Sequence, residues 1–220
     1  MTNERSLHSA IKSWYHLQGD RFEVKVDCYV VDIVRGDLLI EIQTENFSAI
    51  RKKLRTLTKE HRVRLLYPIS LEKMIVNVTL SGEVLSRRRS PKKGRLIDLF
   101  YELVRVPDLF NGDNFSMEVL MIKEEEVRCD DGRGSWKRRG TSIKGRKLIS
   151  IIERTEFTNK TDFLKFLPEY LPQPFTNRSL AESLDISMVL SRKITYSLRK
   201  MGLIREVGKK GRISLFEVIG

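Results

Sequence analysis

The sequence has little cysteine and no long apolar run. Its two cysteines, Cys28 and Cys129, lie far apart and have no metal-ligand spacing, so neither a disulfide framework nor a zinc site is expected. No apolar segment approaches the ~20 residues that a helix needs to cross a bilayer. The N-terminal stretch MTNERSLHSAIKSW lacks the apolar core of a secretory signal. These absences predict a cytoplasmic protein without a membrane segment. Aromatic residues are only 8% of the chain, which argues against a stacking platform for single-stranded RNA.

Acidic residues are also few relative to basic ones. Forty-one lysines and arginines oppose 29 aspartates and glutamates, a formal net charge of +12, and this balance favours a polyanionic partner, above all DNA. The positive charge is clustered, and clustered cations neutralise phosphates and release counterions. We expect nucleic-acid contacts from residues 87–95, which include Arg88, Arg89, Lys92 and Lys93, and from residues 133–147, which include Arg138 and Arg139.

The first 68 residues show the periodicities of a compact α/β core. Apolar residues spaced as on a helix alternate with segments of period two, and Asn46 is placed to cap the second helix. The predicted order is helix, three strands, helix, strand, over residues 3–15, 22–26, 28–34, 38–43, 46–59 and 62–67, with Pro68 closing the last strand. Such an order predicts the α/β class, with a mixed central sheet flanked by helices.

The middle of the chain is less regular. We expect a hairpin formed by residues 74–80 and 83–87 around Ser81-Gly82, a helix over 96–104 and a strand over 117–122. Residues 124–145 turn from acidic to glycine- and arginine-rich. This segment is predicted to be either a mobile loop or a β-hairpin arm.

Two strands near the N-terminus carry acids among apolar residues. With a tight turn at Gly36, Asp32 lies opposite Glu41, and Gln43 follows two residues later on the same face as Glu41. Carboxylates that converge in this way, with an amide beside them, outline a pocket for Mg²⁺. Asp27 is the alternative to Asp32 as the first carboxylate of this pocket, because a bulge in the strand would exchange the positions of the two side chains. The alternative is structural, with Asp32 and Glu41 paired to basic side chains across the sheet.

At Asp32, Glu41 and Gln43 the chain resembles the restriction-endonuclease-like, PD-(D/E)xK, nuclease superfamily. The resemblance covers residues 1–68 and implies an enzyme that hydrolyses phosphodiesters with Mg²⁺ or Mn²⁺. Gln43 then stands in the place of the usual lysine, and Glu4 resembles the extra helical acid of some branches. His8 and Lys12 share the helical face of Glu4. On the second helix, Arg51, Lys52 and Arg55 are the expected backbone contacts, unless they form a solvated face.

Residues 175–218 resemble a winged helix-turn-helix domain. Two short helices, capped at Thr176 or Asn177 and at Ser187, precede a hairpin with a basic tip. If Val189, Leu190, Ile194, Leu198 and Met201 face the core, the second helix exposes Ser191, Arg192, Thr195, Tyr196 and Arg199. The resemblance implies that this helix enters the major groove of DNA. The hairpin residues Lys209, Lys210 and Arg212 are then placed to contact phosphates or the minor groove.

The sequence therefore predicts three parts: a nuclease-like α/β domain over residues 1–127, a basic arm and linker over 128–160, and a winged helix over 161–220. The predicted function is a Mg²⁺-dependent DNA endonuclease. The alternative is a non-catalytic DNA-binding regulator that retains the nuclease fold. A homodimer would supply the two sites that cutting both strands requires.

Overall fold

The structure is a computed structural model that describes residues 3–136 and 140–219, with side chains from residue 7 onward in these ranges. The chain begins with α1 (Asn3–Tyr15), β1 (Arg21–Val26), β2 (Tyr29–Arg35), β3 (Leu38–Ile42), α2 (Phe47–Leu57) and β4 (Arg62–Val78). This order of helix, three strands, helix and strand confirms the prediction for the N-terminal part. The predicted end of the last strand at Pro68 is wrong, because β4 continues to Val78.

The elements that follow are β5 (Val84–Arg89), η1 (Leu96–Leu99), α3 (Phe100–Leu103), η2 (Pro107–Asn111), β6 (Phe115–Asp130), β7 (Thr141–Phe157) and η4 (Lys160–Phe166). The expected hairpin around Ser81-Gly82 is present, since β5 pairs with β4 in antiparallel register from Met74↔Arg89 to Val78↔Val84. The expected arm over 124–145 is a hairpin rather than a loop, because β6 and β7 extend into it as sheet neighbours.

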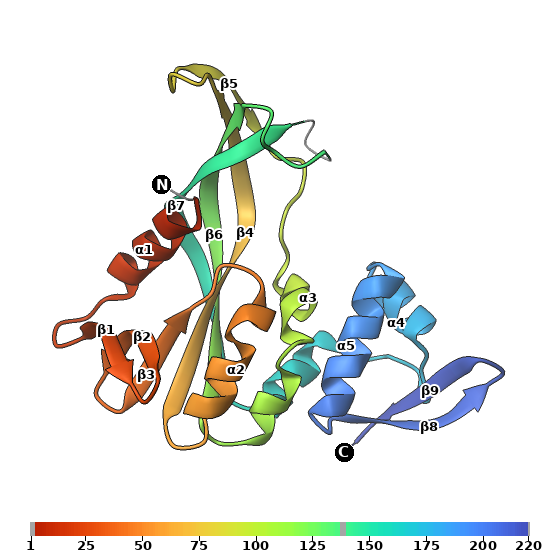
Figure 1. The fold of residues 1–220 in the computed structure, drawn as a ribbon. Coiled ribbons are helices and arrows are strands. Elements are labelled where there is room, and N and C mark those ends of the chain that lie inside the picture. The colour runs from red at the N-terminus through yellow and green to blue at the C-terminus, as the bar shows by residue number, and fades with distance from the viewer. Residues whose placement is uncertain (1–2, 137–139, 220) are drawn as a thin grey trace. The chain divides into compact units, whose positions relative to one another are not determined.

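Seven strands form one large mixed sheet with flanking helices. Its order is β1-β2-β3-β4-β6-β7, and β5 pairs with β4 off this path. Figure 1 shows β4, β6 and β7 as long neighbouring strands, with β5 beside the far end of β4. The β2–β3 turn is tight: Arg35 pairs with Leu38, and Gly36 supplies a φ of 58°, which glycine adopts at little cost.

The chain divides into two compact units. The first comprises Met1–Thr44, Leu65–Leu96 and Glu118–Thr155, and the second comprises Glu45–Arg64, Ile97–Met117 and Glu156–Gly220. In the first unit, α1 buries Leu7, Ile11 and Tyr15 against sheet residues that include Ile40 and Ile42. The spacing of four residues between these α1 side chains places them on one face of the helix, so the α1 stripe forms one layer of the core.

The second unit has an aromatic core and contains α2. Phe163 packs edge-to-face on Phe100 and Phe110 and stacks on Phe157, arrangements that aromatic pairs prefer. The predicted cap of α2 by Asn46 is wrong: Asn46 has a left-handed backbone, and its side chain makes no cap hydrogen bond. The Glu102 carboxylate accepts a hydrogen bond from the Phe47 N–H instead, at 2.9 Å.

The C-terminal part of the second unit has the predicted order of two helices and a hairpin. These elements are α4 (Asn177–Ser183), α5 (Met188–Lys200), β8 (Ile204–Lys210) and β9 (Ile213–Val218). The hydroxyls of Thr176 and Ser187 accept from backbone N–H groups at the starts of α4 and α5, which satisfies donors that a helix leaves open. Gly202, with a φ of 74°, follows the end of α5. Among the described residues, no helix is long and apolar enough to cross a membrane.

Candidate functional site

Asp32 lies where β2 and β3 stop pairing through their backbones. The register runs from Arg35↔Leu38 to Ile33↔Ile40, as the predicted turn at Gly36 requires, and ends one step before Asp32 and Glu41. At that point the Asp32 carboxylate accepts a hydrogen bond from the Ile42 N–H at 2.9 Å. The side chain thus takes over a role that a strand carbonyl has in a regular ladder.

Two basic side chains of α1 also contact Asp32. His8 Nε2 lies 3.1 Å from Asp32 Oδ2, and Lys12 Nζ lies 3.1 Å from Asp32 Oδ1. The Lys12 ammonium also forms an ion pair with Glu23. These contacts match the structural alternative of the sequence analysis, in which Asp32 pairs with basic residues, except that the partners come from a helix rather than from the sheet.

The electrostatics of this cluster favour its charged form. Burial alone would raise the pKa of Asp32, but the hydrogen bond and charge of His8, the Ile42 N–H and the charge of Lys12 together lower that pKa to about 2. Burial would lower the pKa of Lys12, yet Glu23 and Asp32 raise it above its ordinary value. Asp32 is therefore an anion and Lys12 a cation at neutral pH.

The other predicted ligands are placed differently. Glu41 is only 3% exposed and alternates with Ile40 and Ile42, whose side chains belong to the core with α1. Gln43 is half-buried, and its N–H donates to the Leu66 carbonyl at 3.0 Å, which joins β3 to β4. Asp27 is exposed in the β1–β2 turn with a φ of 51°. The side chain of Glu4 lies outside the described residues.

We tested whether these residues fit a divalent metal. Within the described part of the chain, no group of three or more His, Cys, Asp or Glu side chains is arranged to hold a metal ion. Both oxygens of Asp32 already face a basic side chain. In this arrangement the carboxylates therefore do not form a ready ligand set for Mg²⁺, which needs several oxygen ligands in near-octahedral geometry.

The helix α5 exposes fewer of its residues than predicted. Arg192, Tyr196 and Arg199 are exposed as expected, and Val189 is 57% exposed although it was predicted to face the core. The prediction is wrong for two further residues, because Ser191 is 0% and Thr195 3% exposed. Both hydroxyls donate to Asn177 of α4, Ser191 to its carbonyl at 2.6 Å and Thr195 to its side chain at 2.7 Å. Small hydroxyl side chains here join the two helices.

The hairpin after α5 carries its cations at the tip. Lys209, Lys210 and Arg212 are exposed, with Gly211 turning the chain between them at a φ of 62°. No acidic residue occurs between Glu206 and Glu217, and Arg199 of α5 pairs with Glu206 at 2.9 Å. Exposed positive charge therefore lies at the hairpin tip and, on α5, at Arg192 and Lys200.

The remaining predicted DNA contacts fall into three groups. Some form ion pairs with acids: Arg55 Nη2 donates to both carboxylate oxygens of Asp108, at 2.9 and 2.8 Å, and Arg89 lies 3.1 Å from Glu72. Others are exposed, namely Arg51, Lys52, Arg88, Lys92 and Lys93. Arg138 and Arg139 lie outside the described residues.

Three buried glutamates of β6 were missed by the sequence analysis. Glu118, Glu124 and Glu126 are at most 4% exposed. Glu124 accepts from Arg146 at 2.9 Å, while Lys73 lies 2.8 Å from Glu126. Burial would raise the pKa of Glu126, but Lys73 and Arg128 lower it. The sequence signal for these glutamates was their even spacing, because residues separated by an even number of positions along a strand share one face of a sheet.

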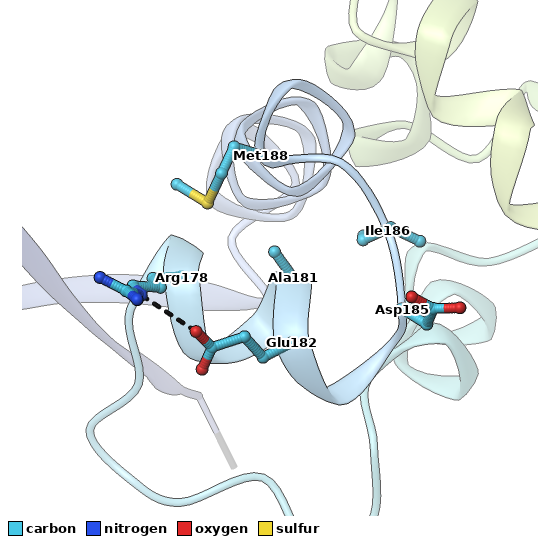
Figure 2. A pocket seen from close by; sticks show the side chains of 6 residues that line it. All are labelled: Arg178, Ala181, Glu182, Asp185, Ile186 and Met188. Atoms are coloured by element: carbon cyan, nitrogen blue, oxygen red, sulfur yellow. Dashed lines mark hydrogen bonds and ion pairs between the residues drawn. The ribbon is translucent and has the colours of Figure 1, made fainter.

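A hollow lies at the turn between α4 and α5. Its volume is about 570 Å³, and it is lined by Arg178, Ala181, Glu182, Asp185, Ile186 and Met188. Figure 2 shows Arg178 reaching Glu182 along α4, a pair separated by 2.9 Å. One arginine against two acids gives the lining a formal charge of −1, so this hollow does not suit a phosphate group.

These features define the class of the protein: an α/β protein with a large mixed sheet and flanking helices, whose C-terminal part consists of two short helices and a β-hairpin. Residues 5–158 match the family described as Domain of unknown function (DUF8091), and the chain belongs to this family. A relative from Treponema pallidum (strain Nichols), named as an uncharacterized protein, is 29% identical over 214 residues, which are 97% of this chain and 84% of the relative. No solved structure matches the chain.

Proposed function

We propose that the protein binds duplex DNA through α5 and the β8–β9 hairpin, as a winged helix does. The observation that carries this proposal is the pairing of an exposed helix face, formed by Arg192, Tyr196 and Arg199, with an exposed hairpin tip that carries Lys209, Lys210 and Arg212. The proposal places the protein in the cytoplasm with its DNA.

The chemistry of the two parts differs. An α-helix fits the major groove, where an arginine such as Arg192 can bind both acceptors of a guanine. Lysines and arginines at a hairpin tip contact phosphates and set the position of the protein without reading sequence. The helix is therefore proposed to specify the site, and the hairpin to supply affinity that depends on salt.

The test is binding of the purified protein to labelled duplexes, chosen from a random pool by the wild-type protein, at several salt concentrations. Replacing Lys209, Lys210 and Arg212 with glutamine should lower the slope of log affinity against log salt by about 2.7, at about 0.9 per phosphate contact. Arg192→Gln should cost about 1–3 kcal/mol on preferred sites and relax discrimination. The matched control is Arg21→Gln with Lys25→Gln, two exposed cations of β1. Equal slopes for wild type and hairpin variant would refute the proposal.

We propose metal-dependent phosphodiester hydrolysis as a second candidate. It is supported by the order of the first six elements and by the β2–β3 register, which runs from Arg35↔Leu38 to Ile33↔Ile40 as the predicted turn at Gly36 requires. Two of the chain's own side chains oppose it, because His8 and Lys12 would have to yield the Asp32 oxygens to a cation. Gln43 could hydrogen-bond a water, but its amide could not serve as a base or as a positive charge.

The test of this candidate is incubation of supercoiled and linear DNA with Mg²⁺, Mn²⁺ or EDTA, for wild type, Glu41→Gln and Asp27→Asn. If DNA hydrolysis depends on the Glu41 carboxylate, wild type and Asp27→Asn should nick the DNA and Glu41→Gln should not. If all three proteins bind DNA and none cuts it, the protein is the non-catalytic regulator. In that case Glu41→Gln should bind DNA as well as wild type or better, because one negative charge is removed.

A further inference from the structure

We propose that a second strip of the protein, on β5 and the segment after it, binds the phosphates of DNA through Arg88, Lys92 and Lys93. This inference rests on the proposed binding of DNA and assigns to it a second contact surface, in the first unit. Its partner is the sugar-phosphate backbone of the duplex.

The basic run at this edge of the sheet is divided by its ion pairs. Arg87 pairs with Glu125 and Arg89 with Glu72. Register and alternation place Arg88 on the other face of β5, opposite Ile75 of β4. No acidic residue occurs between Glu83 and Asp98, and Arg88, Lys92 and Lys93 have no ion pair with a carboxylate among the described residues. Within this run, Arg88, Lys92 and Lys93 are thus available to a phosphate, whereas Arg87 and Arg89 are not.

The segment that carries these cations is fixed in place. Ser90 N–H donates to the Lys73 carbonyl at 2.8 Å, and Gly94 N–H donates to the Ser70 carbonyl at 2.8 Å. At Gly94 the backbone comes so close to β4 that a Cβ would lie 2.6 Å from the Ser70 oxygen. Lys92 and Lys93 therefore lie between two backbone anchors, at Ser90 and Gly94. A fixed backbone loses less entropy when its side chains bind a ligand.

Exposed apolar residues near the tip of the β4–β5 hairpin suggest an alternative partner, an anionic membrane surface. Leu80 is 80% and Leu85 66% exposed. The register shifts at Leu85, so Val84, opposite Val78, shares the face of Arg87 and Arg89, whose charges are neutralised by acids. The polar Ser86, opposite Asn77, shares the face of Arg88. A membrane surface binds an apolar face combined with unpaired cations. The observed division of charge favours DNA.

The experiment measures the salt dependence of DNA binding for the full chain and for the triple variant Arg88→Gln, Lys92→Gln and Lys93→Gln. We expect the slope of log affinity against log salt to fall by about 2.7, at about 0.9 per lost phosphate contact. The same fall is expected in the background of the Lys209, Lys210 and Arg212 variant, because the two surfaces act independently. Arg21→Gln with Lys25→Gln, on the edge strand β1, should leave the slope unchanged, and unfolding temperatures should match throughout.

The outcomes separate this inference from the proposed function. If the β8–β9 hairpin variant lowers the slope and the β5 variant does not, the winged-helix proposal stands and this inference is overturned. If only the β5 variant lowers it, this inference stands and the winged-helix proposal falls. Binding to phosphatidylserine vesicles that requires the three β5 cations, with an unchanged DNA slope, would also overturn it in favour of a membrane partner.

Discussion

The Asp32 cluster makes a quantitative prediction about stability. In Asp32→Asn the amide can still accept from Ile42 N–H, but the charge that faces His8 and Lys12 is lost. The pKa of Asp32 falls from 3.8 to about 2 in the folded protein. At about 1.4 kcal/mol per pKa unit, this difference corresponds to about 2 kcal/mol of folding free energy at neutral pH. The side chain is 14% exposed, so solvent screens the interaction only in part.

The sign follows from the direction of the pKa change. Because the folded-state pKa of Asp32 is lowered, its contribution is complete above the unfolded value near 4 and is lost as the pH falls through the folded value near 2. The free energy of unfolding of wild type should therefore exceed that of Asp32→Asn by about 2 kcal/mol at pH 7. The gap should close between about pH 4 and pH 2. Other acids titrate in both proteins and cancel in the difference.

The assay is urea unfolding followed by tryptophan fluorescence at a series of pH values. Both tryptophans, Trp14 and Trp136, belong to the first unit, which also contains Asp32, so the signal reports the relevant part of the chain. Glu83→Gln serves as the control, because it removes an exposed carboxylate of the same unit. A gap below about 0.5 kcal/mol at pH 7, or one that does not change on acidification, would refute the electrostatic reasoning.

Three other substitutions test packing, ion pairs and capping. Lys73→Met removes a cation shared by two buried β6 glutamates and should lower the free energy of unfolding, measured in urea, by about 3 kcal/mol. The control Lys123→Met, at a side chain that is 42% exposed, should lower it by less than about 1 kcal/mol, and equal losses would contradict the prediction. Gly94→Ala should lower the unfolding temperature by several degrees, because its Cβ would meet the Ser70 oxygen, and an unchanged temperature would show that β4 moves away. Thr176→Ala should cost about 1 kcal/mol through the lost α4 cap, and no change in the urea midpoint would mean that water replaces the hydroxyl.

Local signals were sufficient for the order of elements from α1 to β4 and from α4 to β9. Apolar spacing placed α1 over the residues where it occurs, and the turn at Gly36 fixed the β2–β3 register. Such features depend on residues that are neighbours in sequence, or that a tight turn brings together. The same holds for the Thr176 and Ser187 caps, whose side chains bind backbone groups only three residues away.

The path of β4 through Pro68 could not be predicted in this way. Proline removes a backbone donor and usually ends a strand that has neighbours on both sides. Here β3 is joined to β4 at Leu66, and β5 pairs with β4 from Met74. Pro68 lies between these two contacts along β4, and neither of them uses its N–H. Only the tertiary arrangement of three strands reveals that position.

The distribution of charge was the least predictable part of the site. A count of cations in the sequence treats Arg87, Arg88 and Arg89 alike, yet two of them meet glutamates from other strands and one does not. Asp32 contacts His8, which lies 24 residues earlier in the sequence, and no helical or strand period predicts a contact at that separation. Because a paired cation has already lost much of its attraction for phosphate, these long-range pairs determine which cations the proposed DNA contact can use. The net charge of +12 counts every cation, whereas the pattern of pairing separates those that face an acid from those that do not.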